Sequence, residues 1–266
     1  MKSYLFAACV ALATLPALNA SADTVTFVGS GTGPGSVPVS ASAKFSISGN
    51  TLTITLTNTS ASNSGQDVPG STLTGLFWNS VSNAALTPVS ASVAPGSSII
   101  QSNTCDLGVA ACASLTASTT NVGGEFGYQA AALPGSADRG VASSGYLTTA
   151  KPGNIGNFNN GNAGTNLDGP ASLDGINFGI VSSAAGFNPN GGLAAEPLIQ
   201  NAVIFVLTGV AGLTTADISN VSFQYGTALT ELNVPGHPGT SVPEPGSLAL
   251  VAAGLAGVST LRRRKA

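Results

Sequence analysis

Residues 43–60 read AKFSISGNTLTITLTNTS, and apolar and polar residues alternate there on both sides of Gly49-Asn50. Such alternation predicts half-buried β-strands, and a Gly-Asn pair between two runs predicts a two-residue hairpin turn. Closing the hairpin at this pair gives three apolar cross-strand pairs: Ile47–Leu52, Phe45–Ile54 and Ala43–Leu56. All six side chains then share one face, and Ser and Thr share the other, so register and pattern agree.

Short apolar runs between Gly, Asn, Ser and Pro continue along the chain and predict further strands. They cover residues 24–28, 73–79, 86–93, 176–181, 198–208 and 218–225. We expect the longest run, 198–208, to lie centrally, a short helical turn near 214–218, and a surface loop over 150–177. The predicted fold is a single all-β domain over 23–236, a β-sandwich with jelly-roll-like or Greek-key connections, flanked by an N-terminal signal helix and a C-terminal hydrophobic helix.

Charge is scarce and unevenly distributed. Charged residues form 7% of the chain, against roughly 25% in an ordinary soluble domain, while 43% apolar residues argue against disorder. Outside the two terminal segments the basic residues are Lys44, Arg139 and Lys151, and all 11 carboxylates except Glu244 lie there too. Such a surface is a poor partner for a phosphate backbone, which excludes nucleic acid.

The first 22 residues have the features of an export signal. Lys2 provides a positive start, an apolar core follows over 4–15, and a small-residue cleavage motif comes next. The cleavage residues are Ala20, Ala22 and Asp23, the last being the predicted start of the mature chain. The alternative is a buried N-terminal helix.

Cys105 and Cys112 are the cysteines that remain once Cys9 leaves with the signal peptide. In an exported chain, a pair this close in a Gly/Ala-rich stretch predicts a small disulfide-closed loop. Zinc would need four ligands, and no histidine lies nearby.

Residues 241–266, SVPEPGSLALVAAGLAGVSTLRRRKA, combine three features. Val242, Pro243, Glu244 and Pro245 form an extended motif, since proline disfavours helix. An apolar helix is predicted over 247–261, shorter than the roughly 20 residues that a membrane span needs, and hence a transient anchor. The basic residues Arg262, Arg263, Arg264 and Lys265 form a stop-transfer signal on the cytoplasmic side.

This order of motif, short apolar helix and basic cluster resembles the PEP-CTERM sorting signal of bacterial exosortase substrates. The resemblance implies processing by an exosortase at Pro243-Glu244-Pro245, loss of the tail, and delivery to the surface or matrix of a Gram-negative bacterium that produces exopolysaccharide. The alternative is a plain C-terminal membrane anchor. Residues 39–60 and 218–231 also resemble stretches of a group of exosortase-dependent surface proteins, which has no assigned chemistry.

Candidate catalytic residues are few. The chain has one histidine, His237, in what we interpret as a Pro/Gly linker that begins the segment 237–266. Without a second histidine, and with this one in a linker, the sequence offers no catalytic triad and no histidine metal site within the predicted domain. Paired carboxylates could hydrolyse glycosides, and the candidate pairs are Asp168–Asp174 and Glu125–Asp138. Asp168 and Asp174 are also a weak calcium candidate, although an ordinary Asp-Gly turn explains each; no cofactor is expected.

Aromatic side chains offer a second kind of site, because exposed rings stack on sugars. We interpret Trp78 as core, since it lies in an apolar run, and name Tyr146 and Phe158 as candidate glycan contacts. The sequence thus predicts a non-enzymatic, exported surface or matrix protein, with an exosortase as processing partner and exopolysaccharide as a further partner. The alternatives are a carbohydrate-binding module and a carboxylate-dependent glycoside hydrolase.

Overall fold

The predicted hairpin at Gly49-Asn50 forms in the computed structural model, where β2 (Pro38–Ser48) pairs antiparallel with β3 (Thr51–Asn58). The three predicted apolar pairs are opposite one another, and all six side chains are buried. The structure describes residues 22–61, 68–81, 86–100, 121–123, 125–130, 132–143, 155–158, 176, 178–183, 193 and 196–239.

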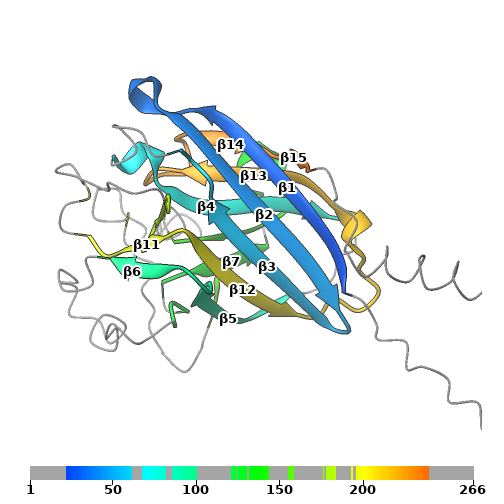
Figure 1. The fold of residues 1–266 in the computed structure, drawn as a ribbon. Helices are drawn as coiled ribbons and strands as arrows, with labels where there is room; N and C mark the ends of the chain where they lie inside the picture. Colours follow the sequence, from blue (N-terminus) through cyan, green and yellow to red (C-terminus); the bar gives the residue numbers. More distant parts are fainter. Residues whose placement is uncertain are drawn as a thin grey trace, which may run out of the picture.

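The hairpin belongs to a six-stranded sheet, in which every neighbouring pair is antiparallel (Figure 1). Its order is β15-β1-β2-β3-β12-β5. The other strands are β1 (Asp23–Thr32), β5 (Thr87–Val93), β12 (Ala202–Thr208) and β15 (His237–Pro238).

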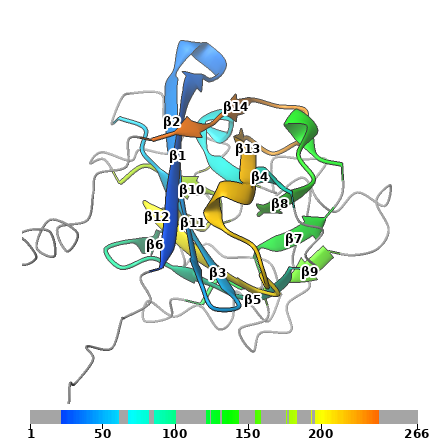
Figure 2. The same cartoon turned by 90° about the vertical axis from the view of Figure 1, so that its right-hand side faces the viewer.

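A second sheet has nine strands, with β4 (Leu73–Ser80) at its centre, and packs against one face of the first, so that β4, β7 and β8 lie to the right of β1 in Figure 2. Its other strands are β6 (Ser98–Ile100), β7 (Gly127–Ala130), β8 (Arg139–Ala142), β9 (Ile155–Asn157), β10 (Ile180–Val181), β11 (Leu198–Gln200), β13 (Ile218–Tyr225) and β14 (Asn233–Pro235). Short 3-10 turns, η1 (Pro34–Ser36), η2 (Pro69–Ser71), η4 (Pro134–Ser136) and η6 (Thr215–Asp217), connect strands. The all-β class is therefore confirmed.

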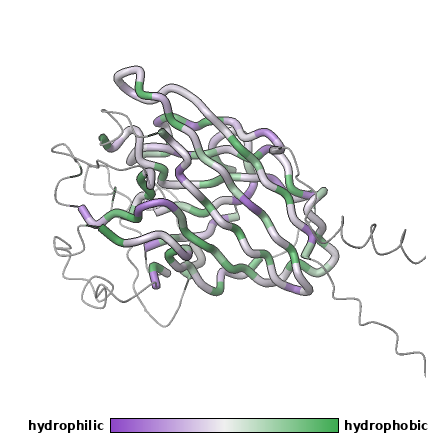
Figure 3. Tube along the Cα trace, viewed as in Figure 1, coloured by the Kyte–Doolittle hydropathy of each residue, from purple (hydrophilic) through white to green (hydrophobic). Residues whose placement is uncertain are grey.

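One hydrophobic core fills the space between the two sheets. Apolar and polar residues alternate along many of the strands that border it (Figure 3). Phe45 of the six-stranded sheet makes an edge-to-face contact with Trp78 of the nine-stranded sheet, their ring centroids 5.7 Å apart. Phe205 makes an edge-to-face contact with Phe126 at 5.0 Å, and its ring is tilted against that of Phe158 at 5.3 Å. Trp78 is fully buried, which confirms its interpretation as core.

The nine-stranded sheet is also covered on its far side. Phe77 of β4 packs there with Leu133, Ala137 and Ala142, and Leu229 lies against this cluster. Because both faces of β4 are covered, its residues are almost all buried, and the strand reads as an apolar run rather than an alternation.

The predicted strand 198–208 is wrong as a single element, because Asn201 divides it between the two sheets. Asn201 has a φ of 84°, a left-handed conformation that ends β11 and turns the chain into β12. Its backbone N–H donates to Val181 O at 2.9 Å, and its carbonyl accepts from Asn58 N–H at 3.0 Å. The Asn58 side chain donates to Ile180 O at 2.8 Å, so two asparagines join the sheets at this corner.

Other differences concern strand ends and strands that were not predicted, among them β9, which lies within the predicted surface loop 150–177 and pairs with β7. The predicted strand 176–181 is reduced to β10, whereas the strand predicted at 24–28 extends to Thr32. The turn expected near 214–218 is present as η6. In the part of the chain that the structure describes, no helix is long and apolar enough to span a membrane. The predicted signal helix and the apolar helix 247–261 lie outside the described residues.

Candidate functional site

Both ends of the described domain lie at the same end of the six-stranded sheet. β15 runs antiparallel to β1, with Pro238 opposite Phe27, and the Gly239 N–H donates to Thr26 O at 2.7 Å. Gly239 is thus held beside Thr26, three residues from Asp23 along β1 (Figure 1). The ordered sheet continues past residue 236, where we placed the start of the linker, because β15 adds to the free edge of β1.

Asp23, the predicted first residue of the mature chain, makes specific contacts at this end. Its carboxylate accepts from the Thr215 backbone N–H at 2.7 Å and from the Thr215 hydroxyl at 2.8 Å. Thr214 and Asp217 form a capping box around the same turn, in which the Asp217 carboxylate accepts from the Thr214 N–H at 2.8 Å and hydroxyl at 2.9 Å. Asp23 therefore fastens η6 to the start of β1.

These contacts make the turn sensitive to acid. The backbone hydrogen bond from Thr214, and then its hydroxyl, hold the pKa of Asp217 below its ordinary value of 3.8. A lowered pKa stabilises the folded turn above the ordinary value, and this stabilisation is lost as the pH falls through the folded value. We expect faster amide exchange at Thr214 below pH 3.8, relative to exchange at core amides such as that of Phe45. Asp217→Asn should abolish this pH dependence, and an unchanged dependence in that variant would contradict the assignment.

The outer face of the six-stranded sheet consists largely of hydroxyl side chains. Thr24, Ser46 and Thr53 lie opposite one another across β1, β2 and β3. Thr26 and Thr55 lie on either side of Lys44, an exposed cation in a neighbouring row. The alternation that buries one face of the hairpin produces these rows on the other.

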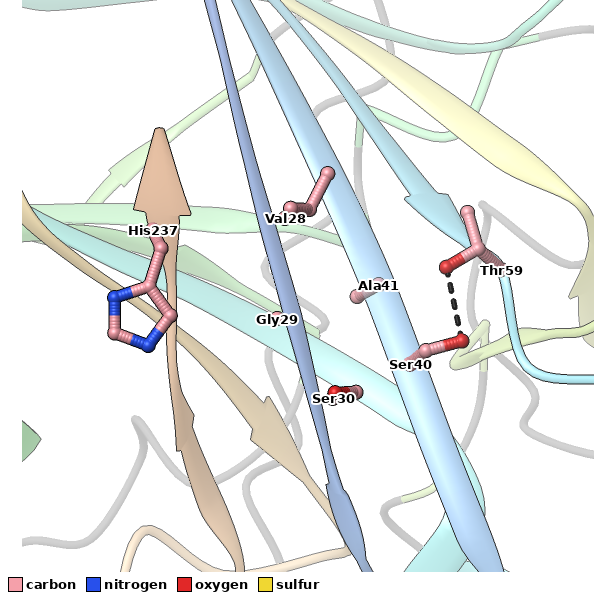
Figure 4. A pocket seen from close by; sticks show the side chains of 7 residues that line it. All are labelled: Val28, Gly29, Ser30, Ser40, Ala41, Thr59 and His237. Carbon is pink, nitrogen blue, oxygen red and sulfur yellow. Dashed lines mark hydrogen bonds between the residues drawn. The ribbon is translucent and has the colours of Figure 1, made fainter. Parts of the chain in front are cut away.

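An open pocket of about 310 Å³ lies on this face, near β15 (Figure 4). It is lined by Val28, Gly29, Ser30, Ser40, Ala41, Thr59 and His237. The Thr59 hydroxyl donates to Ser40 Oγ at 3.0 Å on one side, while His237 stands on the other. Gly29 is required beneath it, since a Cβ there would lie 2.8 Å from the ring of Phe223 and from Pro235 O. The pocket thus offers hydroxyls and one imidazole, groups that hydrogen-bond neutral polar ligands.

The sequence did not reveal this pocket, because its residues come from four separate segments and each is an ordinary strand residue. His237 was the one hint, and its position in β15 rather than in a linker is what brings it to β1. Val28 is 44% exposed in the same pocket, an unusual position for a large apolar side chain.

Phe158 is wrong as a glycan contact. It is fully buried in the core between the sheets, where its ring packs against that of Phe205. Some predicted site residues lie outside the part of the chain that the structure describes. They are Ala20, Cys105, Cys112, Tyr146, Asp168, Asp174, Val242, Pro243, Glu244, Pro245, Arg262, Arg263, Arg264 and Lys265.

The candidate carboxylates Glu125 and Asp138 lie in different environments. Glu125 is 3% exposed, whereas the Asp138 side chain is 52% exposed and makes an ion pair at 3.6 Å with buried Arg139. Burial raises the pKa of nearby Tyr128 to about 12, an effect that the positive charge of Arg139 partly offsets. Among the described residues, no three of His, Cys, Asp or Glu form a group that could hold a metal ion.

Comparison with known proteins bears on the tail. Residues 241–265 match the family model of the PEP-CTERM protein-sorting motif. No curated protein and no solved structure matches the chain. The match confirms the sorting signal predicted from the sequence, and it indicates an exported protein that an exosortase targets to the cell surface.

Proposed function

We propose that this is a non-enzymatic protein of the cell surface or extracellular matrix of a Gram-negative bacterium, in which an exosortase removes the tail and leaves a β-sandwich associated with exopolysaccharide. The observation that carries this proposal is the sorting-motif match at 241–265. Before cleavage, the apolar run within the match is a transient anchor in the inner membrane.

The outer face of the six-stranded sheet supports the association with polysaccharide. Its rows of Ser and Thr hydroxyls present donors and acceptors over three adjacent strands. An array of this kind suits many weak contacts with a long neutral chain, and repeated weak contacts add up through effective concentration. The domain acts in this proposal as a component of the matrix rather than as a catalyst.

Intact-mass analysis of the protein from the native host, with an exosortase-deficient strain beside it, tests the sorting step. We expect a mass that ends near Pro243–Pro245 in the parent strain and an uncut tail in the deficient strain. Replacing Pro243 and Pro245 with alanine should prevent tail removal. Pro95→Ala is the matched control, because Pro95-Gly96-Ser97 repeats the tripeptide at 245–247 outside the matched residues. An intact tail in every strain would reduce the signal to a plain anchor.

A second candidate function, specific recognition of one glycan, is favoured by the pocket beside His237. Its hydroxyls and imidazole could hold a single sugar unit. On a glycan array, recognition at this site predicts selective binding that falls at least tenfold with His237→Ala or Ser40→Ala. The control is Thr53→Ala, which removes a hydroxyl from the same face outside the pocket. Equal losses in all three variants, or no selective binding, would favour the matrix role.

A further inference from the structure

The sorting motif follows the folded sheet with almost no linker. Gly239 is hydrogen-bonded to β1, and Thr240 and Ser241 alone separate it from Val242. An extended chain covers at most about 3.3–3.6 Å per residue. Pro243, four residues after Gly239, therefore lies within about 14 Å of the sheet edge.

This distance matters because a protease binds its substrate as an extended peptide on both sides of the cleaved bond, much as an added strand pairs with a sheet edge. On the C-terminal side, the apolar run that starts at Leu248 is held in the membrane until cleavage. On the N-terminal side, the folded domain begins within a few residues. The domain as folded thus competes with the protease for the residues that precede the motif.

β15 is the part of the six-stranded sheet that can open locally. It has two residues, both exposed, and one of them is a proline without a backbone N–H. It pairs with β1 alone, at the edge of the sheet. Short edge elements of this kind open locally at little cost in free energy.

The opening has a natural limit at Gly236. The Gly236 N–H donates to Val221 O at 2.7 Å, and Val234 in β14 is buried in the core. Release of 237–239 alone would lengthen the free chain before Pro243 from about 14 Å to about 24 Å, at the same extension per residue. Nothing in the core has to move for this gain.

We propose that β15 is a releasable strap, and that the exosortase cleaves chains in which residues 237–239 have left β1. This inference rests on the proposed exosortase processing and adds a conformational step to it. After cleavage the strap closes again on Phe27 and Val28 and returns His237 to the pocket. Processing is therefore coupled to the state of the sheet edge and not to the motif sequence alone.

A reversible cross-link tests the strap. Val28 and His237 are opposite one another, at a separation that a disulfide can bridge, so Val28→Cys with His237→Cys should lock β15 to β1 in the oxidising periplasm. We expect the locked chain to lose its tail at least tenfold more slowly than the parent in a pulse-chase experiment read by intact mass. Each single cysteine variant is a control for the side-chain change and should be processed at the parental rate.

A linker variant separates the strap from a folding defect. Eight Gly/Ser residues inserted between Gly239 and Thr240 supply the missing reach, so the locked chain with this insert should be processed at the parental rate. Fast processing of the locked chain without the insert would overturn the strap, and so would slow processing that the insert does not restore. If the parent itself keeps its tail in the exosortase-positive strain, the proposed function fails first, and the two failures remain distinguishable.

Discussion

Replacing Trp78 with alanine is expected to lower the free energy of unfolding by about 3–5 kcal/mol, because a fully buried ring leaves a cavity that the sheets cannot close. Trp78 is fully buried between the sheets. Its ring centroid lies 5.7 Å from that of Phe45 and 6.3 Å from that of Tyr128, so the substitution removes contacts on both sides of the core. Whole domains are stable by only about 5–15 kcal/mol, so the loss is a large share.

Urea unfolding of the mature domain measures the effect. It is monitored by far-ultraviolet circular dichroism of the backbone, because this signal does not depend on the tryptophan that is replaced. Val28→Ala is the matched control, since Val28 is 44% exposed and its loss should change stability by no more than about 0.5 kcal/mol. If the two variants unfolded at the same urea concentration, Trp78 would not join the two sheets.

The second large effect concerns the corner between the sheets. Asn201→Val is expected to cost about 2–3 kcal/mol, because a β-branched residue at positive φ is strained by about 1–2 kcal/mol and a hydrogen bond is lost as well. The Asn201 amide donates to Ser97 Oγ at 3.0 Å. The backbone at Asn201 holds β11 and β12 in different sheets, so strain there acts on both.

Asn201→Gly isolates the backbone contribution. Glycine adopts the same φ without strain but lacks the side-chain amide that donates to Ser97. This variant should therefore lose about 1 kcal/mol of the free energy of unfolding at most. Thermal unfolding of the two variants gives the comparison. Equal losses would mean that the Ser97 contact, and not the backbone conformation, stabilises the corner.

The sequence predicts the hairpin well because local and long-range preferences agree there. Gly49-Asn50 sets the turn, and the alternation around Phe45 and Ile54 sets the same register. At Asn201 they disagree, since the run 198–208 is apolar on both sides of the pair Gln200-Asn201, and apolar periodicity alone carries no sign of a change of sheet. The asparagine of this polar pair, a residue type that tolerates positive φ, is the signal that could have indicated the break.

The candidate sites also differ in how far the sequence could predict them. The sorting signal is continuous in the sequence, so its residues could be recognised together, and the family match confirms it. The pocket depends on β15 pairing with β1, an association of residues more than 200 positions apart. Phe158 could not be placed either, because an aromatic ring among turn residues is compatible with the surface and with the core, and only its packing on Phe205 distinguishes them.

The hydroxyl rows on the six-stranded sheet have a consequence for the medium in which the protein works. Salt screens interactions between exposed charges that are farther apart than a Debye length, about 8 Å at physiological ionic strength, but the rows across β1, β2 and β3 carry one charged side chain, Lys44. Contacts between this face and a neutral polysaccharide should therefore keep their strength from fresh water to brine. A cell does not control the salinity outside its envelope, and contacts made by Ser and Thr hydroxyls do not depend on that salinity.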